Sequence, residues 1–428
     1  MKHADIIQTL DLEQKCALLS GGTVFDTRAL PGKGIPSITL SDGPNGVRKQ
    51  AGAADHLGLN PSVPATCFPT SATVANSWDP ALGEAVGEAM GEEAAAQEVS
   101  VLLGPGLNIK RSPLCGRNFE YFSEDPYLAG KMAAGYVRGI QKNGIAACPK
   151  HFAVNSQELR RMASDSIVDE RTLRELYLTG FEIVVKEAKP KTIMSSYNLV
   201  NGTYANENAH LLQDILRRDW GFDGAVVTDW GGSNDHALGV KNGSTLEMPF
   251  PGDDSVRELM KAVESGKISE HDVDARLDEL LELVLDTKAA VEKAPRTFDA
   301  AAHHALARRA AAQSIVLLRN EGALLPLKKG EKIAVLGDFA RTPRYQGAGS
   351  SAVNSIQVDS FLDCLTESGL TNVGYAQGFD RQGKADEDLK KEAVALAQNA
   401  NVVLLCMGLD EIKESCLLYT SPSPRDRG

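Results

Sequence analysis

Short apolar runs alternate with longer, helix-like stretches along the first two-thirds of the chain. The runs are bounded by Gly, Pro, Asn or Asp, which is typical of strands buried on both faces. They lie at residues 38–41, 71–75, 100–103, 145–148, 192–196, 225–227 and 246–249. The stretches between them predict helices at residues 80–98, 127–142, 169–188 and 208–218, with Asp79 and Asp169 as N-caps of the first and third.

Strands that alternate with helices predict a parallel sheet and therefore an α/β fold. We expect a TIM-like (β/α)8 barrel over residues 1–291. Only about seven strand-like runs are present, so an incomplete or irregular barrel stays open as an alternative. Residues 270–291 predict a long amphipathic helix at the end of this domain, because apolar residues recur there at helical spacing.

A second, smaller domain is predicted beyond a break in this pattern. Residues 292–299 (EKAPRTFD) interrupt the periodicity with Pro and polar residues, which is typical of a linker. Over residues 300–415 we expect a partial open α/β sandwich with strands 314–318, 332–336 and 402–406 and helices 300–313, 356–369 and 384–399. Residues 416–428 (CLLYTSPSPRDRG) change to a Ser/Pro/Arg composition, and we expect a non-native tail there.

Charge and cysteine usage narrow the class of protein. The net charge of −12 is spread over 428 residues without a basic cluster, which argues against nucleic acid or an anionic membrane as a partner. The seven cysteines form no CxxC pair, so we expect reduced thiols in the core of a cytoplasmic protein. We also expect a small-molecule substrate, and the chain could form a homo-oligomer.

Candidate chemistry gathers at the predicted strand ends. Asp229 follows strand 225–227, and active-site groups of a parallel barrel lie at the carboxyl ends of its strands. The alternative is that Asp229 caps the next helix. The other chemistry-bearing residues at strand ends are Asp42, Arg117, Lys150, His151, Tyr197 and Trp230. Carboxylates and cationic donors bind hydroxyl groups and aromatic rings pack on sugar rings, so the set predicts a site for a neutral polyol.

Each of these residues also has a structural alternative. Arg117 could pair with Glu120 or Glu124 within its loop. His151 could be a satisfied buried histidine and Trp230 a core residue. A different enzyme class also remains, because a lysine at a barrel strand end, here Lys150, suits a Schiff-base aldolase.

Several function classes are excluded by missing motifs. The chain has no HExxH motif or His/Cys cluster, so we expect no metal site. It also has no GxSxG or Walker A motif. The glycines of residues 347–351 (GAGSS) lack the strand–turn–helix context of a nucleotide site, and we expect no cofactor.

The motifs together resemble glycoside hydrolase family 3, in its β-glucosidase branch. They are SDGPNGVR (41–48), GPGLNIKRSPLCGRNFEYFSEDP (104–126), KHFAVNSQELR (150–160), MSSYNLVNG (194–202), VVTDWGG (226–232), LEMP (246–249) and GAGSS (347–351). The resemblance implies a retaining β-glucosidase, in which a carboxylate forms a glycosyl-enzyme that water then hydrolyses.

The resemblance also implies roles for individual residues. Asp229 would be the nucleophile, and Trp230 would face the leaving group. Tyr197 would lie beside the nucleophile, and Ser351 would reach the site from the second domain. The residues expected to bind the sugar hydroxyls are Asp42, Arg117, Lys150 and His151. The cationic Lys150 and Arg117 would keep Asp229 ionised.

One position departs from the family pattern. The acid/base glutamate is expected after Gly408–Ser415 (GLDEIKES), but the residue there is Cys416. Glu411 and Glu414 lie close in sequence but out of register. We therefore expect this chain to lack the acid/base, which makes a non-catalytic glycan-binding fragment an alternative to an active glycosidase.

Overall fold

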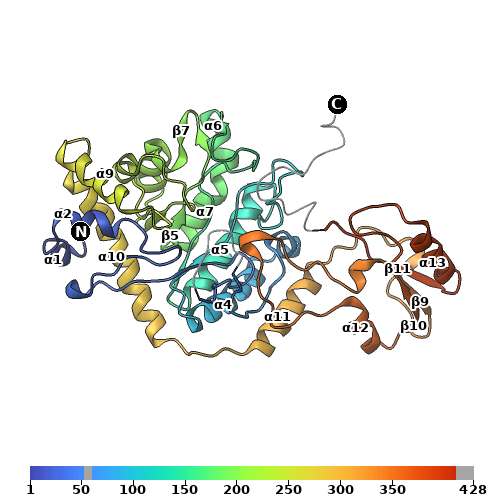
Figure 1. The fold of residues 1–428 in the computed structure, drawn as a ribbon. Helices are drawn as coiled ribbons and strands as arrows, with labels where there is room; N and C mark the ends of the chain where they lie inside the picture. Colours follow the sequence, from blue (N-terminus) through green and yellow to red (C-terminus); the bar gives the residue numbers. More distant parts are fainter. Residues whose placement is uncertain (53–59, 411–428) are drawn as a thin grey trace.

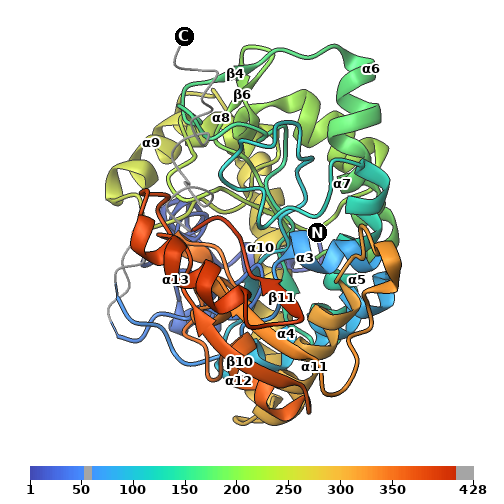
Figure 2. The ribbon, with the colours of Figure 1, turned by 90° about the vertical axis from the view of Figure 1, so that its right-hand side faces the viewer.

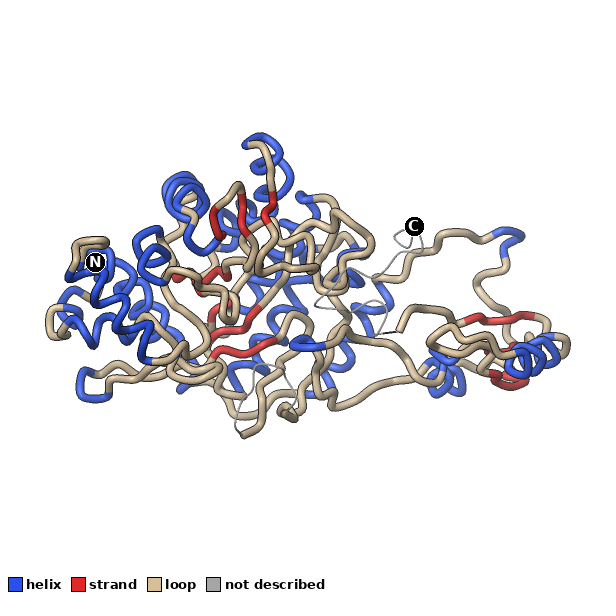
Figure 3. Tube along the Cα trace, turned by 45° about the horizontal axis from the view of Figure 1, so that its top comes forward, coloured by secondary structure: helices blue, strands red, loops and turns tan. Residues whose placement is uncertain are grey.

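The computed structural model describes residues 1–52 and 60–410. The larger part of the molecule has short parallel strands in its interior, with helices packed around them (Figure 1, Figure 3). Two sheets are formed, one in the order β1-β2-β3 and the other of β5 and β8. The strand bounds are β1 Leu40–Asp42, β2 Val101–Leu103, β3 Ala146–Ala147, β5 Thr192–Met194 and β8 Ala225–Val227.

Single parallel bridges pair further residues, both between the two sheets and next to β8. Phe152 pairs with Ser195, which places the chain after β3 beside the end of β5. Val227 pairs with Leu246, so the chain at Leu246 lies next to β8. These observations confirm the α/β class and the parallel pairing. The closed eight-stranded barrel stays a prediction, because the described interior strands β1, β2, β3, β5 and β8 form two separate sheets joined and extended by single bridges.

Alternate strand residues face opposite sides, as a pleated strand requires. On β2, Leu102 packs in the cluster beneath helices α4 (Pro80–Ala96) and α5 (Pro126–Gln141), whereas Val101 and Leu103 face the other core cluster. Because both faces of the sheet are covered by apolar side chains, β2, β3 and β8 contain only apolar residues. The candidate site residues lie at or beyond the carboxyl ends of the strands.

Helices cover the sheets on the outside. Asp79 caps α4 by accepting from Ala81 N (2.9 Å), and Asp169 caps α6 by accepting from Thr172 N (3.0 Å), as predicted. The remaining helices of this part are α1 Ala4–Ile7, α2 Leu12–Leu18, α3 Ser71–Val74, α6 Glu170–Thr172, α7 Thr179–Ala188, α8 His236–Asn242, α9 Asp253–Glu264 and α10 Glu270–Lys293, with π-helical turns at Leu173–Leu178 and His210–Asp219. A small sheet of β4 (Asp165–Ser166), β6 (Leu199–Val200) and β7 (Thr203–Tyr204) lies above them.

Three predictions for this part need correction. Residues 71–75 are not a strand but a helical turn, α3, because a short buried apolar run looks the same in either state. Residues 246–249 form only single bridges. The helix predicted to stop at 291 continues to Lys293, two residues into the predicted linker. The division into domains itself stays a prediction.

The second part of the chain is a three-stranded parallel sheet in the order β10-β9-β11. Ile333 and Val335 of β9 pack with Leu365 of helix α12, whereas Leu336 packs with Ala393 of helix α13, so the two helices cover opposite faces. Figure 2 shows α13 in front of this sheet. The bounds are α11 Ala300–Gln313, β9 Lys332–Leu336, α12 Phe361–Glu367, β10 Thr371–Ala376, α13 Glu387–Ala397 and β11 Val402–Leu405.

Two predictions for this part also differ from the structure. Residues 314–318 form no strand, since no neighbouring strand pairs with them in the part of the chain that the structure describes. The strand β10 was not predicted, because its polar start (Thr371, Asn372) and its Gly374 conceal the strand pattern. A strand needs a partner to satisfy its backbone, and a local sequence pattern does not supply one.

Candidate active site

Asp229 lies two residues beyond β8, at the carboxyl end of the sheet. Its Oδ1 accepts a hydrogen bond from the Trp230 backbone N (2.8 Å), and its Oδ2 lies 3.7 Å from His151 Nε2. Oδ2 is buried and accepts no hydrogen bond from the described residues. The N-cap alternative is wrong, because α8 is capped by Asp235, whose Oδ1 accepts from Leu238 N (2.9 Å).

Lys150 and His151 follow β3, and both side chains are buried at 3% and 1% exposure. The Lys150 Nζ lies 3.9 Å from Glu120 Oε2. Burial lowers the pKa of His151 well below its usual value, and the positive charges of Arg117, Lys150 and Arg161 lower it further. The imidazole is therefore neutral and faces Asp229 as a hydrogen-bonding group rather than as a cation.

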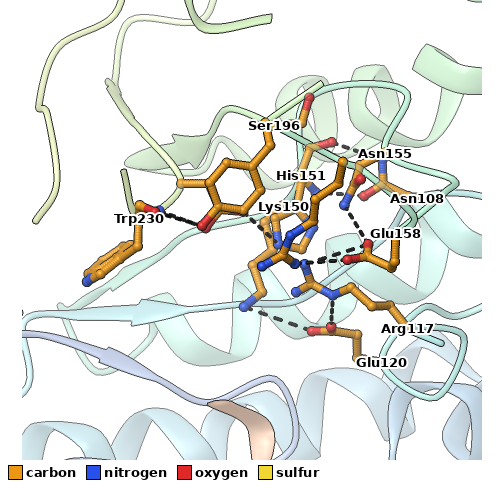
Figure 4. Close-up of polar contacts among 12 residues, drawn as sticks. Asn108, Arg117, Glu120, Lys150, His151, Asn155, Glu158, Ser196 and Trp230 are labelled. Atoms are coloured by element: carbon orange, nitrogen blue, oxygen red, sulfur yellow. Dashed lines mark hydrogen bonds and ion pairs between the residues drawn. The ribbon is translucent and has the colours of Figure 1, made fainter. Parts of the chain in front are cut away.

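Arg117 forms a buried ion pair with Glu120, with Nε 2.5 Å from Oε1 (Figure 4). This confirms the alternative in which Arg117 pairs within its loop, with Glu120 as the partner. Burial alone would raise the pKa of Glu120, but Arg117 and Lys150 together hold it below the usual value. Arg117 and Lys150 thus share one buried carboxylate. The ion pair with Glu120 holds Arg117 in a fixed position among the candidate site residues.

Glu120 is expected to be essential for the stability of this cluster. Replacing Glu120 with Gln leaves Arg117 and Lys150 without their shared charge, and breaking a buried pair in this way costs about 3–5 kcal/mol. We expect a clear loss of the free energy of unfolding in urea for Glu120→Gln and none for Glu124→Gln, because Glu124 is exposed. Equal stability of the two variants would contradict the assignment.

The sequence analysis missed Glu158 and Arg161. Glu158 Oε2 accepts from Arg161 Nη1 (2.9 Å), and its Oε1 lies 4.0 Å from Arg117 Nη1. The Arg161 guanidinium lies over the Tyr197 ring, 4.6 Å from its centroid. The signal in the sequence was the motif KHFAVNSQELR (150–160), which contains Glu158 and ends one residue before Arg161. Only the conformation of this loop in the folded chain places these two charges at the site.

Asp42 ends β1 and lies 3.8 Å from Arg48 Nη1. Burial raises the pKa of Asp42 to about 6, the neighbouring Lys150 and Arg48 lower it, and the carboxylate of Asp229 raises it. Because its pKa is raised, the Asp42 carboxyl binds a proton more readily in the folded protein than in the unfolded chain. Its carboxylate, the form that accepts sugar hydroxyls best, is therefore populated mainly above that pH.

Tyr197 and Trp230 contact each other through one hydrogen bond. The Tyr197 hydroxyl donates to the Trp230 backbone O (2.8 Å), and burial together with the charge of Asp229 raises the pKa of Tyr197 well above its usual value. The indole Nε1 of Trp230 donates to Val24 O (2.7 Å), and its ring lies 5.4 Å from the Phe25 ring, centroid to centroid. The ring of Trp230 is thus held by the chain before β1.

Ser351 comes from the second part of the chain, in the helical turn Gly349–Ser351. Its hydroxyl donates to Ala348 O (2.8 Å) within its own loop. The flanking residues dock on the first part, since Ala65 N donates to Asn354 O (3.0 Å). The loop containing Ser351 is therefore anchored beside Ala65, and its hydroxyl makes no recorded hydrogen bond to another candidate residue in the described part of the chain.

Gly347 is the tightest point of this docking. A Cβ on Gly347 would overlap the ring of Phe119, the residue before Glu120. We expect Gly347→Ala to displace the loop and to lower the free energy of unfolding in urea by about 1–3 kcal/mol, the cost of overpacking. Gly32→Ala is the matched control because nothing lies within 4 Å of its added Cβ. Recovered stability in Gly347→Ala combined with Phe119→Leu would support this cause, and unchanged stability of Gly347→Ala alone would contradict it.

Two further findings concern the described residues only. Within residues 1–52 and 60–410, no three His, Cys, Asp or Glu side chains cluster in a way that could hold a metal ion. Over the same residues no helix combines the length and the apolar character needed to cross a bilayer. Cys416, Glu411 and Glu414, the residues around the expected acid/base position, lie outside the described part of the chain.

The sequence and the fold are similar to those of known glycosidases. The chain is 47% identical over 416 residues to the thermostable beta-glucosidase B of Acetivibrio thermocellus, covering 96% of this chain and 55% of that protein. It is 46% identical over 420 residues to the exo-alpha-(1->6)-L-arabinopyranosidase of Bifidobacterium longum, with the same two coverages. The crystal structure of the GH3 beta-glucosidase of Bifidobacterium adolescentis superimposes with a TM-score of 0.90 at 43% identity, over 96% of this chain and 59% of that one.

The chain thus spans little more than half the length of these relatives. Family descriptions match both parts of it. Residues 53–283 match the glycosyl hydrolase family 3 N terminal domain, and residues 315–427 match the C-terminal domain of the same family. With these matches and 47% identity over 96% of its length, the chain belongs to glycosyl hydrolase family 3.

Proposed function

We propose that the protein is a retaining β-glucosidase with Asp229 as its nucleophile. The observation that carries the proposal is the state of Asp229 Oδ2, which is buried without a donor and faces the neutral imidazole of His151 at 3.7 Å. A carboxylate oxygen that accepts no hydrogen bond from the protein is available to attack the substrate. In the first step it bonds to the anomeric carbon while the bond to the leaving-group oxygen breaks. Water then cleaves the glycosyl-enzyme and frees Asp229.

The surrounding charges suit this role. Arg117, Lys150 and Arg161 lie beside Glu120 and Glu158 in one buried cluster of charges next to His151 and Asp229. The same groups, with Asp42, supply charge-assisted hydrogen bonds to sugar hydroxyls. Trp230 offers an aromatic face for the leaving group. We also infer that the parallel strands belong to one irregular barrel, whose carboxyl ends bring these residues together.

The aldolase alternative is not favoured. The chain belongs to a glycosyl hydrolase family, and its Lys150 Nζ lies 3.9 Å from the buried carboxylate of Glu120, inside the cluster of charges. Substrate choice within the glycosidases is a separate question. Since one relative is named an exo-alpha-(1->6)-L-arabinopyranosidase at 46% identity, an α-L-arabinopyranoside is the second substrate to test beside the β-glucoside.

We further propose that Cys416 leaves this chain without the acid/base of the β-glucosidase branch. The support is the register of the preceding motif, Gly408–Ser415. Release of poor leaving groups would then be slow, because general acid assistance is worth about 10²–10⁴-fold. Without that assistance the chain would still form the glycosyl-enzyme from an activated substrate.

We propose a reducing compartment, the cytoplasm, as its location. Six described cysteines are free thiols. Burial raises the pKa of Cys16, Cys67 and Cys148 to about 12, so these thiols stay protonated and unreactive. Fractionation of the producing cells tests this point.

A trapping experiment tests the proposed function. The protein is incubated with dinitrophenyl 2-deoxy-2-fluoro-β-D-glucoside, whose leaving group needs no proton, and with the corresponding α-L-arabinopyranoside. We expect a stoichiometric release of dinitrophenolate and a mass increase that peptide mapping places on Asp229. A label on another carboxylate, or turnover with an inverted first product, would overturn the assignment. The faster of the two substrates gives the sugar preference.

A further inference from the structure

A chain of buried hydrogen bonds runs behind His151, on the side away from Asp229. Asn155 Nδ2 donates to Glu158 Oε1 (3.2 Å) and to the Tyr121 hydroxyl oxygen (3.2 Å). The Tyr121 hydroxyl lies 3.1 Å from His151 Nδ1. These four residues are at most 1% exposed, so bulk water does not compete for their hydrogen bonds. Figure 4 shows Asn155, Glu158 and His151 in this group.

The direction of the chain is set by Glu158. Burial raises the pKa of Glu158, while Arg117 and Arg161 lower it. Paired with Arg161 at 2.9 Å as a carboxylate, Glu158 only accepts hydrogen bonds, so the amide NH2 of Asn155 and not its oxygen faces it. The second hydrogen of this NH2 then points at the Tyr121 oxygen, which becomes an acceptor. The one hydrogen of the Tyr121 hydroxyl is left to donate to His151 Nδ1.

The consequence is the tautomer of His151. A neutral imidazole carries a single N–H, and the tautomer follows from the hydrogen bond that the other nitrogen makes. If Nδ1 accepts from Tyr121, the proton lies on Nε2, which is the nitrogen 3.7 Å from Asp229 Oδ2. The other tautomer would point a lone pair at the carboxylate. It would also leave the Tyr121 hydrogen without an acceptor among the described residues.

We propose that Tyr121 is a positioning residue that holds His151 in its Nε2–H form, so that the side of the ring that faces Asp229 presents an N–H donor to the sugar. The inference rests on the proposed glycosidase function and deepens it. Tyr121 touches neither Asp229 nor any other charged group of the site by a hydrogen bond that the structure records. Its effect on the reaction is therefore transmitted through His151.

The tautomer of His151 can be measured by NMR, without an activity assay. In protein labelled with ¹⁵N-histidine, long-range ¹⁵N–¹H spectra distinguish a protonated from an unprotonated ring nitrogen, and the His151→Gln variant identifies the His151 signals. We expect an unprotonated Nδ1 and a protonated Nε2 in the wild-type chain. We expect Tyr121→Phe, which keeps the ring and removes the hydroxyl, to lose this preference. A protonated Nδ1 in the wild type, or an unchanged spectrum in Tyr121→Phe, would overturn the proposal.

The proposal also predicts a fall in kcat/KM for Tyr121→Phe, and Tyr136→Phe is the matched control. With dinitrophenyl β-glucoside we expect kcat/KM of Tyr121→Phe to fall roughly 10- to 100-fold, the range for loss of a partner that orients a binding histidine. Tyr136 is equally buried, at 1%, and its hydroxyl has no hydrogen-bond partner among the described residues. Tyr136→Phe should therefore change neither kcat/KM nor the His151 spectrum.

The two proposals fail separately. If the wild-type chain forms no glycosyl adduct, the proposed function fails, while the His151 spectrum still decides the role of Tyr121. If the adduct forms and Tyr121→Phe keeps the full kcat/KM of the wild type, the positioning role is refuted and the glycosidase remains.

Discussion

Replacing Asp229 with Ala is expected to abolish adduct formation and to reduce hydrolysis of dinitrophenyl β-glucoside by about 10⁴-fold or more, the scale found when a covalent nucleophile is removed. The physical reason is that no other carboxylate of the site has an oxygen in the same state. Glu120 and Glu158 are committed to buried ion pairs with Arg117 and Arg161. Among Glu120, Glu158 and Asp229, the three buried carboxylates of the site, Asp229 (9% exposed) is the one with a buried oxygen that accepts no hydrogen bond from the described residues.

Azide separates loss of the nucleophile from loss of the fold. In Asp229→Ala the removed side chain leaves room for a small anion, which can attack the anomeric carbon directly. We expect α-glucosyl azide, with configuration opposite to that of the substrate, detected by NMR. Asp254→Ala is the control, because Asp254 is exposed on α9 and, among the described residues, forms its ion pair with Arg257. Wild-type turnover by Asp229→Ala, or a β-configured azide product, would refute the nucleophile assignment.

Replacing Cys416 with Glu is expected to raise kcat/KM for a β-glucoside with a poor leaving group, such as cellobiose, by about 10²–10⁴-fold. The reason is chemical. An alkoxide leaves slowly unless it is protonated as the bond breaks, whereas dinitrophenolate is stable without a proton. The gain should therefore be small with dinitrophenyl β-glucoside, and the ratio of the two substrates is the measurement.

Cys416→Gln is the matched control, since glutamine has the size of glutamate and no proton to donate. An equal gain in Cys416→Gln, or no gain in Cys416→Glu, would contradict the proposed position of the acid/base. Glu414→Gln in the wild-type background checks the neighbouring residue. If that variant alone removes activity on cellobiose, Glu414 supplies the proton and the proposal for position 416 is wrong.

The sequence by itself determined the family and the residues at the strand ends. Asp229, Lys150 and His151 follow short apolar runs bounded by turn residues, which predicted interior strands, and active-site groups of a parallel sheet lie at the carboxyl ends of its strands. Local patterns of this kind depend only on neighbours in the chain. For the same reason the caps Asp79 and Asp169 were predicted correctly.

The tertiary structure alone decided which charges meet. Glu158 and Arg161 come from a loop without periodicity, and their place beside Arg117 and Tyr197 follows from the path of that loop. Gly347 approaches Phe119 closely although the two positions lie more than 200 residues apart in the sequence. A short-range sequence pattern cannot predict such a contact. The strand predicted at 314–318 failed for this reason as well. Strand formation, ion pairing and tautomer choice depend on partners distant in sequence, which only the folded chain brings within hydrogen-bonding distance.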